Sequence, residues 1–358
     1  MNTIFKTFKI ILYCMISILM LCCKNEKSGL LTIYVDTDAE TPLALSEITS
    51  SLDSVKLELT DKSLIKNPFR IVCTDDYILF VETKAMMLFD RSGKFIRQIG
   101  SIGQGPGEFT GIWDATIDTK ENKISLITHG LKRMCYDFNG NLLTEYQSVS
   151  SAPINNLYFV NNRLLLLCET PVKQNDIRKN ETYLYTLTSD LKDIDTIFIR
   201  SIDHKGIWLH PYKDFITHDG EKTYLYYSDI SKNCFLIDTL FQLNNKEVVA
   251  NLHMDFKNKG LSPNGEKEIN IFTIYRNSRY VFAFYNAKNQ YYYFCHDTKT
   301  GKSYNMKDGY KDDIYTGEKV KIRPLNSDAN QFYFLHTEID DTTLEEPNPT
   351  LYIGRLKK

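Results

Sequence analysis

The stretch that decides the fold is residues 92–109, which read SGKFIRQIGSIGQGPGEF. Four glycines and Pro106 lie within 100–107, where the glycines allow backbone angles that side chains forbid. A short β-like run precedes the glycines and another begins at Trp113, so the loop is expected to join two small sheets. Its backbone amides could also hold the carboxylate of Glu108 or of a ligand. A nucleotide-binding loop is not expected, because Pro106 leads into a strand and not into a helix.

Similar turns recur along the chain. The segments 90–94 (DRSGK) and 137–141 (DFNGN) begin 47 residues apart, and 297–302 (DTKTGK) repeats the pattern later. In each turn a glycine stands where a positive φ is needed between two strands. A period of about 50 residues is the length of a four-stranded propeller blade.

Apolar and aromatic runs separated by polar clusters predict an all-β chain, and Tyr and Phe, at 23 and 20 residues, suit pleated surfaces. The expected strands form six groups: 69–73, 77–82, 86–89 and 95–99; 113–117, 123–128, 133–137 and 142–146; 154–160, 163–168, 182–187 and 195–200; 215, 224–227, 234–237 and 246–251; 269–275, 280–285 and 290–295; and 320, 331–336 and 350–356. An insertion at 173–180 is expected to lengthen the third group.

We therefore predict that residues 51–358 form one six-bladed β-propeller. The last blade has only three strands of its own, and the alternating run 54–59 (SVKLEL) is expected to supply the fourth. A strand from near the N-terminus would then complete the final blade, close the ring and remove exposed sheet edges.

The first 23 residues predict a targeting segment. Lys6 and Lys9 precede an apolar run, 10–21, which has the length of a secretory signal core and is short for a membrane span. Cys23, or alternatively Cys22, is the expected lipid-attachment site. Ordinary signal cleavage or a short membrane anchor are the alternatives. Residues 24–50 are polar and irregular, and they are expected to be a tether.

Composition excludes some functions. Lys and Arg total 43 against 45 Asp and Glu, which leaves no basic footprint for nucleic acid. The cysteines beyond the signal stand singly in apolar runs, so neither a zinc site built from cysteines nor a disulfide framework is expected, and all five should be buried thiols: Cys73, Cys135, Cys168, Cys234 and Cys295.

Five segments of the sequence resemble a known family, and four of them lie in the turn-rich N-terminal half. The segments are 45–65 (LSEITSSLDSVKLELTDKSLI), 88–109 (LFDRSGKFIRQIGSIGQGPGEF), 113–128 (WDATIDTKENKISLIT), 136–143 (YDFNGNLL) and 348–358 (NPTLYIGRLKK). They resemble the six-bladed β-propeller lipoproteins of gram-negative bacteria, which are related in fold to NHL-repeat propellers. The resemblance is strong over 45–147 and thinner over 150–345. It implies a lipid-anchored outer-membrane protein, periplasmic or surface-facing, with no activity established for most members.

Propeller topology predicts where a site would lie. Each innermost strand starts, and each second strand ends, at the face that carries the connections between blades, and loops there converge on the channel mouth. The candidate ligand-binding residues at that face are Lys84, Glu108, Trp113, His129, Glu169, His204, Trp208, His210, Tyr212, Asp229, Arg323 and His336. His218 and His253 are expected on other faces.

Two functions and a purely structural or scaffolding role remain open at this point. The first is a binding module for a glycan, a peptide or an envelope protein, with aromatic side chains as flat contact surfaces. The alternative is a metal-assisted lyase or hydrolase, in which His129, His336 and either His204 or His210 hold a Zn²⁺ ion. No histidines stand at metal-ligand spacing in the sequence, and no activated nucleophile is visible, so no catalytic residue or cofactor is assigned.

Overall fold

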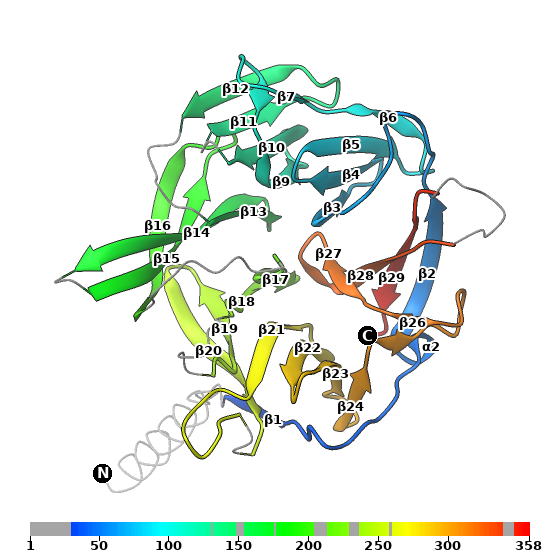
Figure 1. Cartoon of the computed structure of the whole chain (residues 1–358), viewed down its shortest axis with the longest axis vertical. Helices are drawn as coiled ribbons and strands as arrows, with labels where there is room; N and C mark the ends of the chain where they lie inside the picture. The colour runs from blue at the N-terminus through cyan, green and yellow to red at the C-terminus, as the bar shows by residue number, and fades with distance from the viewer. Residues whose placement is uncertain are drawn as a thin grey trace, which may run out of the picture. The chain divides into compact units, whose positions relative to one another are not determined.

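The computed structural model describes residues 30–129, 132–147, 154–174, 177–203, 213–228, 236–257, 260–338 and 347–358. One compact unit covers Thr32–Lys358. In this unit, small antiparallel sheets are arranged around a central axis, which is the arrangement of a β-propeller (Figure 1). The described residues contain one short helix, α2 (Leu45–Ile48). The all-β prediction is therefore confirmed.

Four sheets have four strands each and form separate blades, in which consecutive strands are neighbours. These blades contain β3 (Arg70–Cys73), β4 (Tyr77–Glu82), β5 (Ala85–Asp90) and β6 (Phe95–Gln98); β9 (Ile112–Asp118), β10 (Lys123–Thr128), β11 (Lys132–Tyr136) and β12 (Leu142–Gln147); β13 (Ile154–Val160), β14 (Arg163–Gln174), β15 (Ile177–Leu187) and β16 (Asp193–Asp203); and β21 (Ile269–Arg276), β22 (Tyr280–Ala287), β23 (Gln290–Asp297) and β24 (Lys302–Lys307). The described part of the expected insertion at 173–180 lengthens the β14–β15 pair, which extends to Gln174 opposite Ile177.

A further sheet has nine strands. Its members are β1 (Leu31–Tyr34), β20 (Glu247–Asp255), β19 (Thr239–Asn244), β18 (Lys222–Leu225), β17 (Ile216–Asp219), β28 (Asp328–His336), β29 (Thr350–Leu356) and β2 (Thr49–Lys56), with β27 (Arg323–Leu325) beside β28. Its two halves meet only at β17 and β28, through a single parallel pair of His218 with Asp328. Two small two-stranded sheets pair β7 (Ser101–Ile102) with β8 (Glu108–Phe109), and β25 (Tyr310–Lys311) with β26 (Lys319–Val320).

The N-terminal part of the described chain is folded, which corrects the expected tether over residues 31–50. Strand β1 lies beside β20, and Leu43, Leu45 and Ile48 are buried in one cluster with Tyr352 and other residues near the C-terminus. Short segments that are buried through a few apolar side chains show no clear hydrophobic period in the sequence. The strand expected at 54–59 is shifted toward the N-terminus, because β2 covers Thr49–Lys56 and pairs antiparallel with β29.

The predicted hairpin turns are confirmed. Gly93, Gly140 and Gly301 have φ angles of 91°, 80° and 71°. The carboxylate of Asp90 accepts hydrogen bonds from the backbone N–H groups of Ser92 and Lys94 at 2.9 and 3.0 Å, which stabilises the first turn. The expected strand at 234–237 is not observed in its described part, 236–237, since β19 begins at Thr239.

The glycine loop holds a carboxylate with its own backbone, as expected for Glu108. The N–H of Gly105 donates to Glu108 Oε2 at 2.8 Å, and a side chain on Gly103 would collide with that oxygen. The N–H of Gly107 donates to Glu145 at 2.7 Å. The loop is therefore filled by protein carboxylates and links the first blade to the second.

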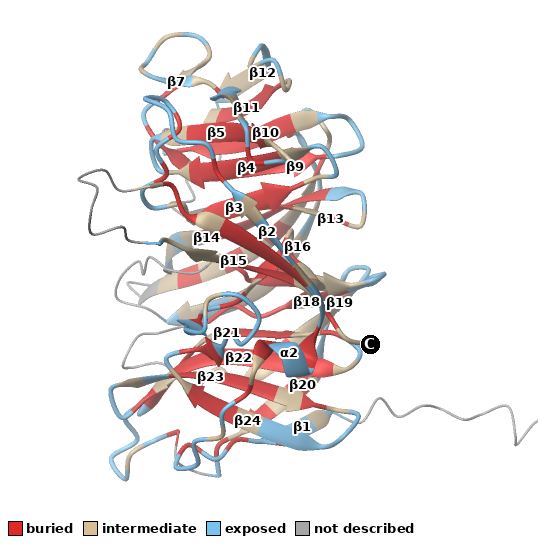
Figure 2. Ribbon diagram, turned by 90° about the vertical axis from the view of Figure 1, so that its right-hand side faces the viewer, coloured by how far each residue is buried: buried red, intermediate tan, exposed pale blue. Residues whose placement is uncertain are grey.

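Most of the core lies between neighbouring blades, and Figure 2 shows buried residues concentrated in the strands. One cluster joins Leu79 and Leu88 of the first blade to Ala115 and Leu126 of the second. The cysteines that the structure describes are buried, as predicted: Cys73, Cys135, Cys168 and Cys295. Cys234 lies outside the described residues.

None of the helices in the described part of the chain is long and apolar enough to cross a membrane.

Candidate functional site

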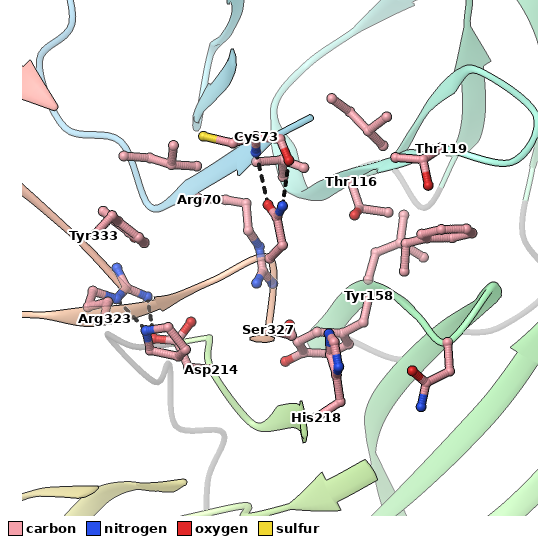
Figure 3. A pocket seen from close by; sticks show the side chains of 18 of the residues that line it. Arg70, Cys73, Thr116, Thr119, Tyr158, Asp214, His218, Arg323, Ser327 and Tyr333 are labelled. Carbon is pink, nitrogen blue, oxygen red and sulfur yellow. Dashed lines mark hydrogen bonds and ion pairs between the residues drawn. The ribbon is translucent and has the colours of Figure 1, made fainter. Parts of the chain in front are cut away.

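A pocket of about 380 Å³ lies among the innermost strands, and we call it the axial pocket (Figure 3). Strands β3, β9, β13, β17 and β27 converge there from five directions in Figure 1. The lining residues are Phe69, Arg70, Ile71, Val72, Cys73, Thr116, Ile117, Thr119, Leu157, Tyr158, Phe159, Asn161, Asn162, Asp214, His218, Glu221, Arg323, Pro324, Asn326, Ser327 and Tyr333.

The two ends of the axial pocket differ in exposure. Lining residues near the starts of the innermost strands, such as Arg70 and Asp214, are buried. Thr119, Asn162 and Glu221, which follow the ends of innermost strands, are exposed. The axial pocket therefore opens between the turns that join first and second strands. This corrects the prediction that the site lies at the face of the inter-blade connections.

The closed end is built around a buried ion pair between two blades. Arg70 Nε donates to Asp114 Oδ1 at 3.0 Å, and Arg70 Nη2 donates to Asp114 Oδ2 at 2.5 Å. Burial alone would lower the pKa of the guanidinium, but the Asp114 carboxylate outweighs burial and raises that pKa. The backbone N–H of Leu157 in the third blade also donates to Asp114, at 2.9 Å. Three blades are thus joined at one carboxylate.

A second ion pair and a lysine complete the charged layer. Arg323 Nε and Nη2 lie 2.9 and 2.8 Å from Asp214 Oδ2. Next to Asp214, the Lys213 ammonium donates to the carbonyl of Trp113 and lies 4.0 Å from the centroid of the Phe69 ring. Burial lowers the pKa of Lys213 to about 8, the charges of Arg70 and Arg323 add to this effect, and Asp114 opposes it.

The open end has polar walls. Asn161 and Asn162, and likewise Asn326 and Ser327, have positive φ angles and form tight turns at the rim. Asn326 also acts as a clamp between blades. Its amide accepts from the N–H of Cys73 at 2.9 Å and donates to the Cys73 carbonyl at 2.5 Å, as the dashed lines of Figure 3 show.

His218 supplies a polar atom without a protein partner. It lies in β17, and its side chain lines the axial pocket. Its Nδ1 atom is buried and makes no hydrogen bond to any residue that the structure describes. His218 was expected on a face other than that of the inter-blade connections, and it lies near the end of the innermost strand β17. It was not among the candidate residues because the site was placed at the opposite face.

The predicted site residues are only partly brought together. Arg323 lines the axial pocket, and Trp113 and His129 are in contact, with ring centroids 4.7 Å apart. Burial lowers the pKa of His129, and the charge of Lys213 adds to this effect. Five of the predicted residues lie outside the described ranges: His204, Trp208, His210, Tyr212 and Asp229.

The remaining predicted residues have local roles. Glu108 is held by the glycine loop, and buried Glu169 accepts a hydrogen bond from Asn180 at 2.8 Å. Lys84 is exposed at a separate hollow, and His336 Nδ1 lies 3.7 Å from a carboxylate oxygen of Glu318. None of these four residues lines the axial pocket.

The proposed metal site is only partly covered by the structure. Among the residues described, no three His, Cys, Asp or Glu side chains form a group that could hold a metal ion. His204 and His210, which were expected to complete the set with His129 and His336, fall outside that part of the chain.

Several site residues were not identified from the sequence. Arg70, Asp114 and Thr116 lie within otherwise apolar innermost strands, and Lys213 and Asp214 directly precede one. A charged residue inside such a strand is a usable signal, because a buried charge requires a partner. The identity of that partner depends on which blades meet at the axis.

A solved structure shares this architecture. The crystal structure of a presumed exported protein from Bacteroides fragilis has a TM-score of 0.65 at 18% identity, with 92% of this chain and 100% of that chain covered. The WD40 repeats of RRP9 have a TM-score of 0.42 at 8% identity, with 89% and 99% covered. The first likeness shows the fold, and the second is too distant to support an argument.

No curated protein matches the sequence significantly. The family model described as a domain of unknown function, DUF4934, matches residues 30–356. Because this match extends over nearly the whole chain, the protein belongs to the DUF4934 family.

Proposed function

We propose that this chain is an exported, lipid-anchored propeller of six blades that binds a small polar ligand in the axial pocket. The observation that carries the proposal is the axial pocket itself, about 380 Å³ in volume, whose lining includes the buried polar side chains of Arg70, Thr116 and Asp214.

The size and rigidity of the axial pocket support ligand binding. Its volume of about 380 Å³ lies within the range of small-molecule sites, which is about 300–1,000 Å³. Its walls are strands held by ion pairs and by the Asn326 clamp, so they are organised before a ligand arrives. Of the partner classes expected from the sequence, a single sugar unit or the end of a peptide fits this volume. A folded protein could contact only the rim.

The number of blades follows from dividing the nine-stranded sheet. Its halves, β17–β20 with β1 and β27–β29 with β2, are joined by one residue pair only. Counting each half as a blade gives six with the four separate sheets, and β2 then completes the last blade and closes the ring. Kinship with NHL-repeat propellers is part of the same proposal and rests on the sequence motifs.

Export and anchoring rest on the first 23 residues and are supported by the description of the Bacteroides fragilis protein as exported. An outer-membrane lipoprotein of a gram-negative cell should incorporate labelled palmitate. Cys23→Ser should abolish labelling, whereas Cys22→Ser should not. Labelling that survives the double replacement would contradict lipid attachment.

Binding can be tested without knowing the ligand. Native mass spectrometry of the mature protein, purified gently from its own cell envelope, should show a population carrying a small adduct. Thr116 is buried and lines the axial pocket, so Thr116→Phe should fill it and remove the adduct. Thr196→Phe on the outer strand β16 is the control and should retain it. An adduct that persists in Thr116→Phe, or its absence from the natural protein, would count against the proposal.

A further inference from the structure

Counted over the described residues, the charged layer at the closed end of the axial pocket has an excess of one positive charge. Arg70, Lys213 and Arg323 are the cations, and Asp114 and Asp214 are the carboxylates. The five groups are close enough to influence one another electrostatically. Because uncompensated charge in a protein interior is unfavourable, the layer is suited to receive one further negative charge.

Arg70 is the group through which the excess positive charge can contact a ligand. Its Nε and Nη2 atoms are engaged with Asp114, but Nη1 has no hydrogen-bond partner among the described residues. The side chain lines the axial pocket, and Figure 3 shows it projecting into that space. Nη1 therefore offers two N–H donors on a guanidinium whose orientation is fixed by the bidentate pair.

Lys213 does not fill this role. Its ammonium donates to the Trp113 carbonyl and lies against the Phe69 ring, and it is absent from the pocket lining. Its positive charge contributes to the excess from a position behind the residues that line the pocket. The size of the excess also selects the ligand, because a single carboxylate would neutralise it, whereas a phosphate dianion would leave one negative charge buried.

The rest of the pocket lining fits a hydroxylated ligand. Thr116, Thr119 and Asn162 contribute hydroxyl and amide groups to the lining, and Tyr158 and Tyr333 contribute aromatic side chains. Glu221 stands exposed at the rim, where it would repel an anionic group. The carboxylate of a ligand should therefore lie at the closed end and its hydroxyls at the rim.

We propose that the ligand of the axial pocket is a sugar acid with one carboxylate, bound through that carboxylate to Arg70 Nη1. This inference rests on the proposed binding function and adds the chemical class of the ligand.

Isothermal titration of the mature protein tests the inference directly. D-glucuronate and D-galacturonate should bind, each about ten- to a hundredfold more tightly than its neutral parent, D-glucose or D-galactose, since a charged hydrogen bond is gained. Glucose 6-phosphate and N-acetylglycine should bind more weakly than the uronates, because the first carries excess charge and the second lacks hydroxyls.

Arg70→Lys tests the residue. Lysine keeps a positive charge for Asp114 but cannot present Nη1, so uronate affinity should fall about tenfold while the weak binding of the neutral sugars stays unchanged. Arg133→Lys is the matched control. Arg133 is also buried and paired with a carboxylate, Asp193, but does not line the axial pocket, so its replacement should not change binding.

Each contrary result has a defined meaning. Equal affinity for uronates and parent sugars, with both lost in Thr116→Phe, would overturn the sugar acid and leave the proposed function intact. Failure of both uronates to bind also overturns it, and the proposed function is then judged by the native adduct alone. Glucose 6-phosphate that binds more tightly than the uronates would overturn the inferred single negative charge of the ligand. N-acetylglycine that binds more tightly than the uronates would overturn the inference that the ligand carries hydroxyls. The comparison within the natural protein stands even if Arg70→Lys does not fold.

Discussion

Replacing Lys213 by methionine should stabilise the propeller at neutral pH, by an amount that shrinks as the pH rises. The pKa of Lys213 is lowered from its ordinary value of 10.5 to about 8, mainly by burial. This shift corresponds to roughly 3 kcal/mol of unfavourable free energy when the folded protein holds the ammonium. Methionine removes that cost and loses the hydrogen bond to Trp113 and the contact with Phe69, which together contribute about 2 kcal/mol. The variant should therefore gain about 1 kcal/mol at pH 7.

The pH dependence gives the sharper test. Because the folded-state pKa lies below the unfolded one, the unfolded chain binds more protons between pH 8 and 10.5, and the free energy of unfolding of the natural protein rises with pH in that window. Relative to Lys213→Met, the natural protein should gain about 1 kcal/mol between pH 7 and 9. Other titrating groups cancel in this difference.

Urea unfolding followed by circular dichroism at pH 7, 8 and 9 measures the effect. Lys246→Met is the control, since Lys246 is exposed and pairs with Asp195 at the surface, and its difference from the natural protein should stay nearly constant. A stability gap between the natural protein and Lys213→Met that is independent of pH, or that widens in favour of the variant, would refute the account of Lys213 as a buried ammonium without a carboxylate partner.

Two further predictions concern the packing of the ring. Asn326→Gly keeps the positive φ of the turn but removes both hydrogen bonds to Cys73, so the free energy of unfolding should fall by about 2 kcal/mol, and an unchanged urea midpoint would show that the clamp contributes nothing. The thiols of Cys73, Cys135, Cys168 and Cys295 are buried, and burial raises the pKa of Cys73 to about 12, so iodoacetamide at pH 8 should label them only after unfolding. Peptide mapping that finds any of the four labelled in the folded protein would contradict their burial.

The sequence predicts the strands well where turns are marked by glycine. Gly93, Gly140 and Gly301 each occupy the positive φ that the pattern required, and the strands on both sides of Gly93 and Gly140 fall within one or two residues of the expected bounds. The strand β24 after Gly301 was not among the expected strands. The prediction fails where the chain has no period. Leu43 and Leu45 are buried through contacts with residues far along the chain, so nothing local distinguishes them from a tether.

The candidate site was harder to predict than the fold. Topology directed attention to the propeller axis, and Arg323, one of the residues it selected, lines the axial pocket. It could not show that the charged layer closes one end of the pocket, because the pairing of Arg70 with Asp114 and of Arg323 with Asp214 depends on how blades meet in space. For the same reason the open end, with His218 and the turns of Asn162 and Ser327, was missed.

The central claim is that the axial pocket is a ligand site, and a crystal structure of the mature protein soaked with D-galacturonate tests it most directly. The account predicts density for one sugar inside the pocket, with its carboxylate within hydrogen-bonding distance of Arg70 Nη1 and its hydroxyls toward Thr116 and the rim. Density for the sugar at another surface, with an axial pocket that contains only water, would contradict it.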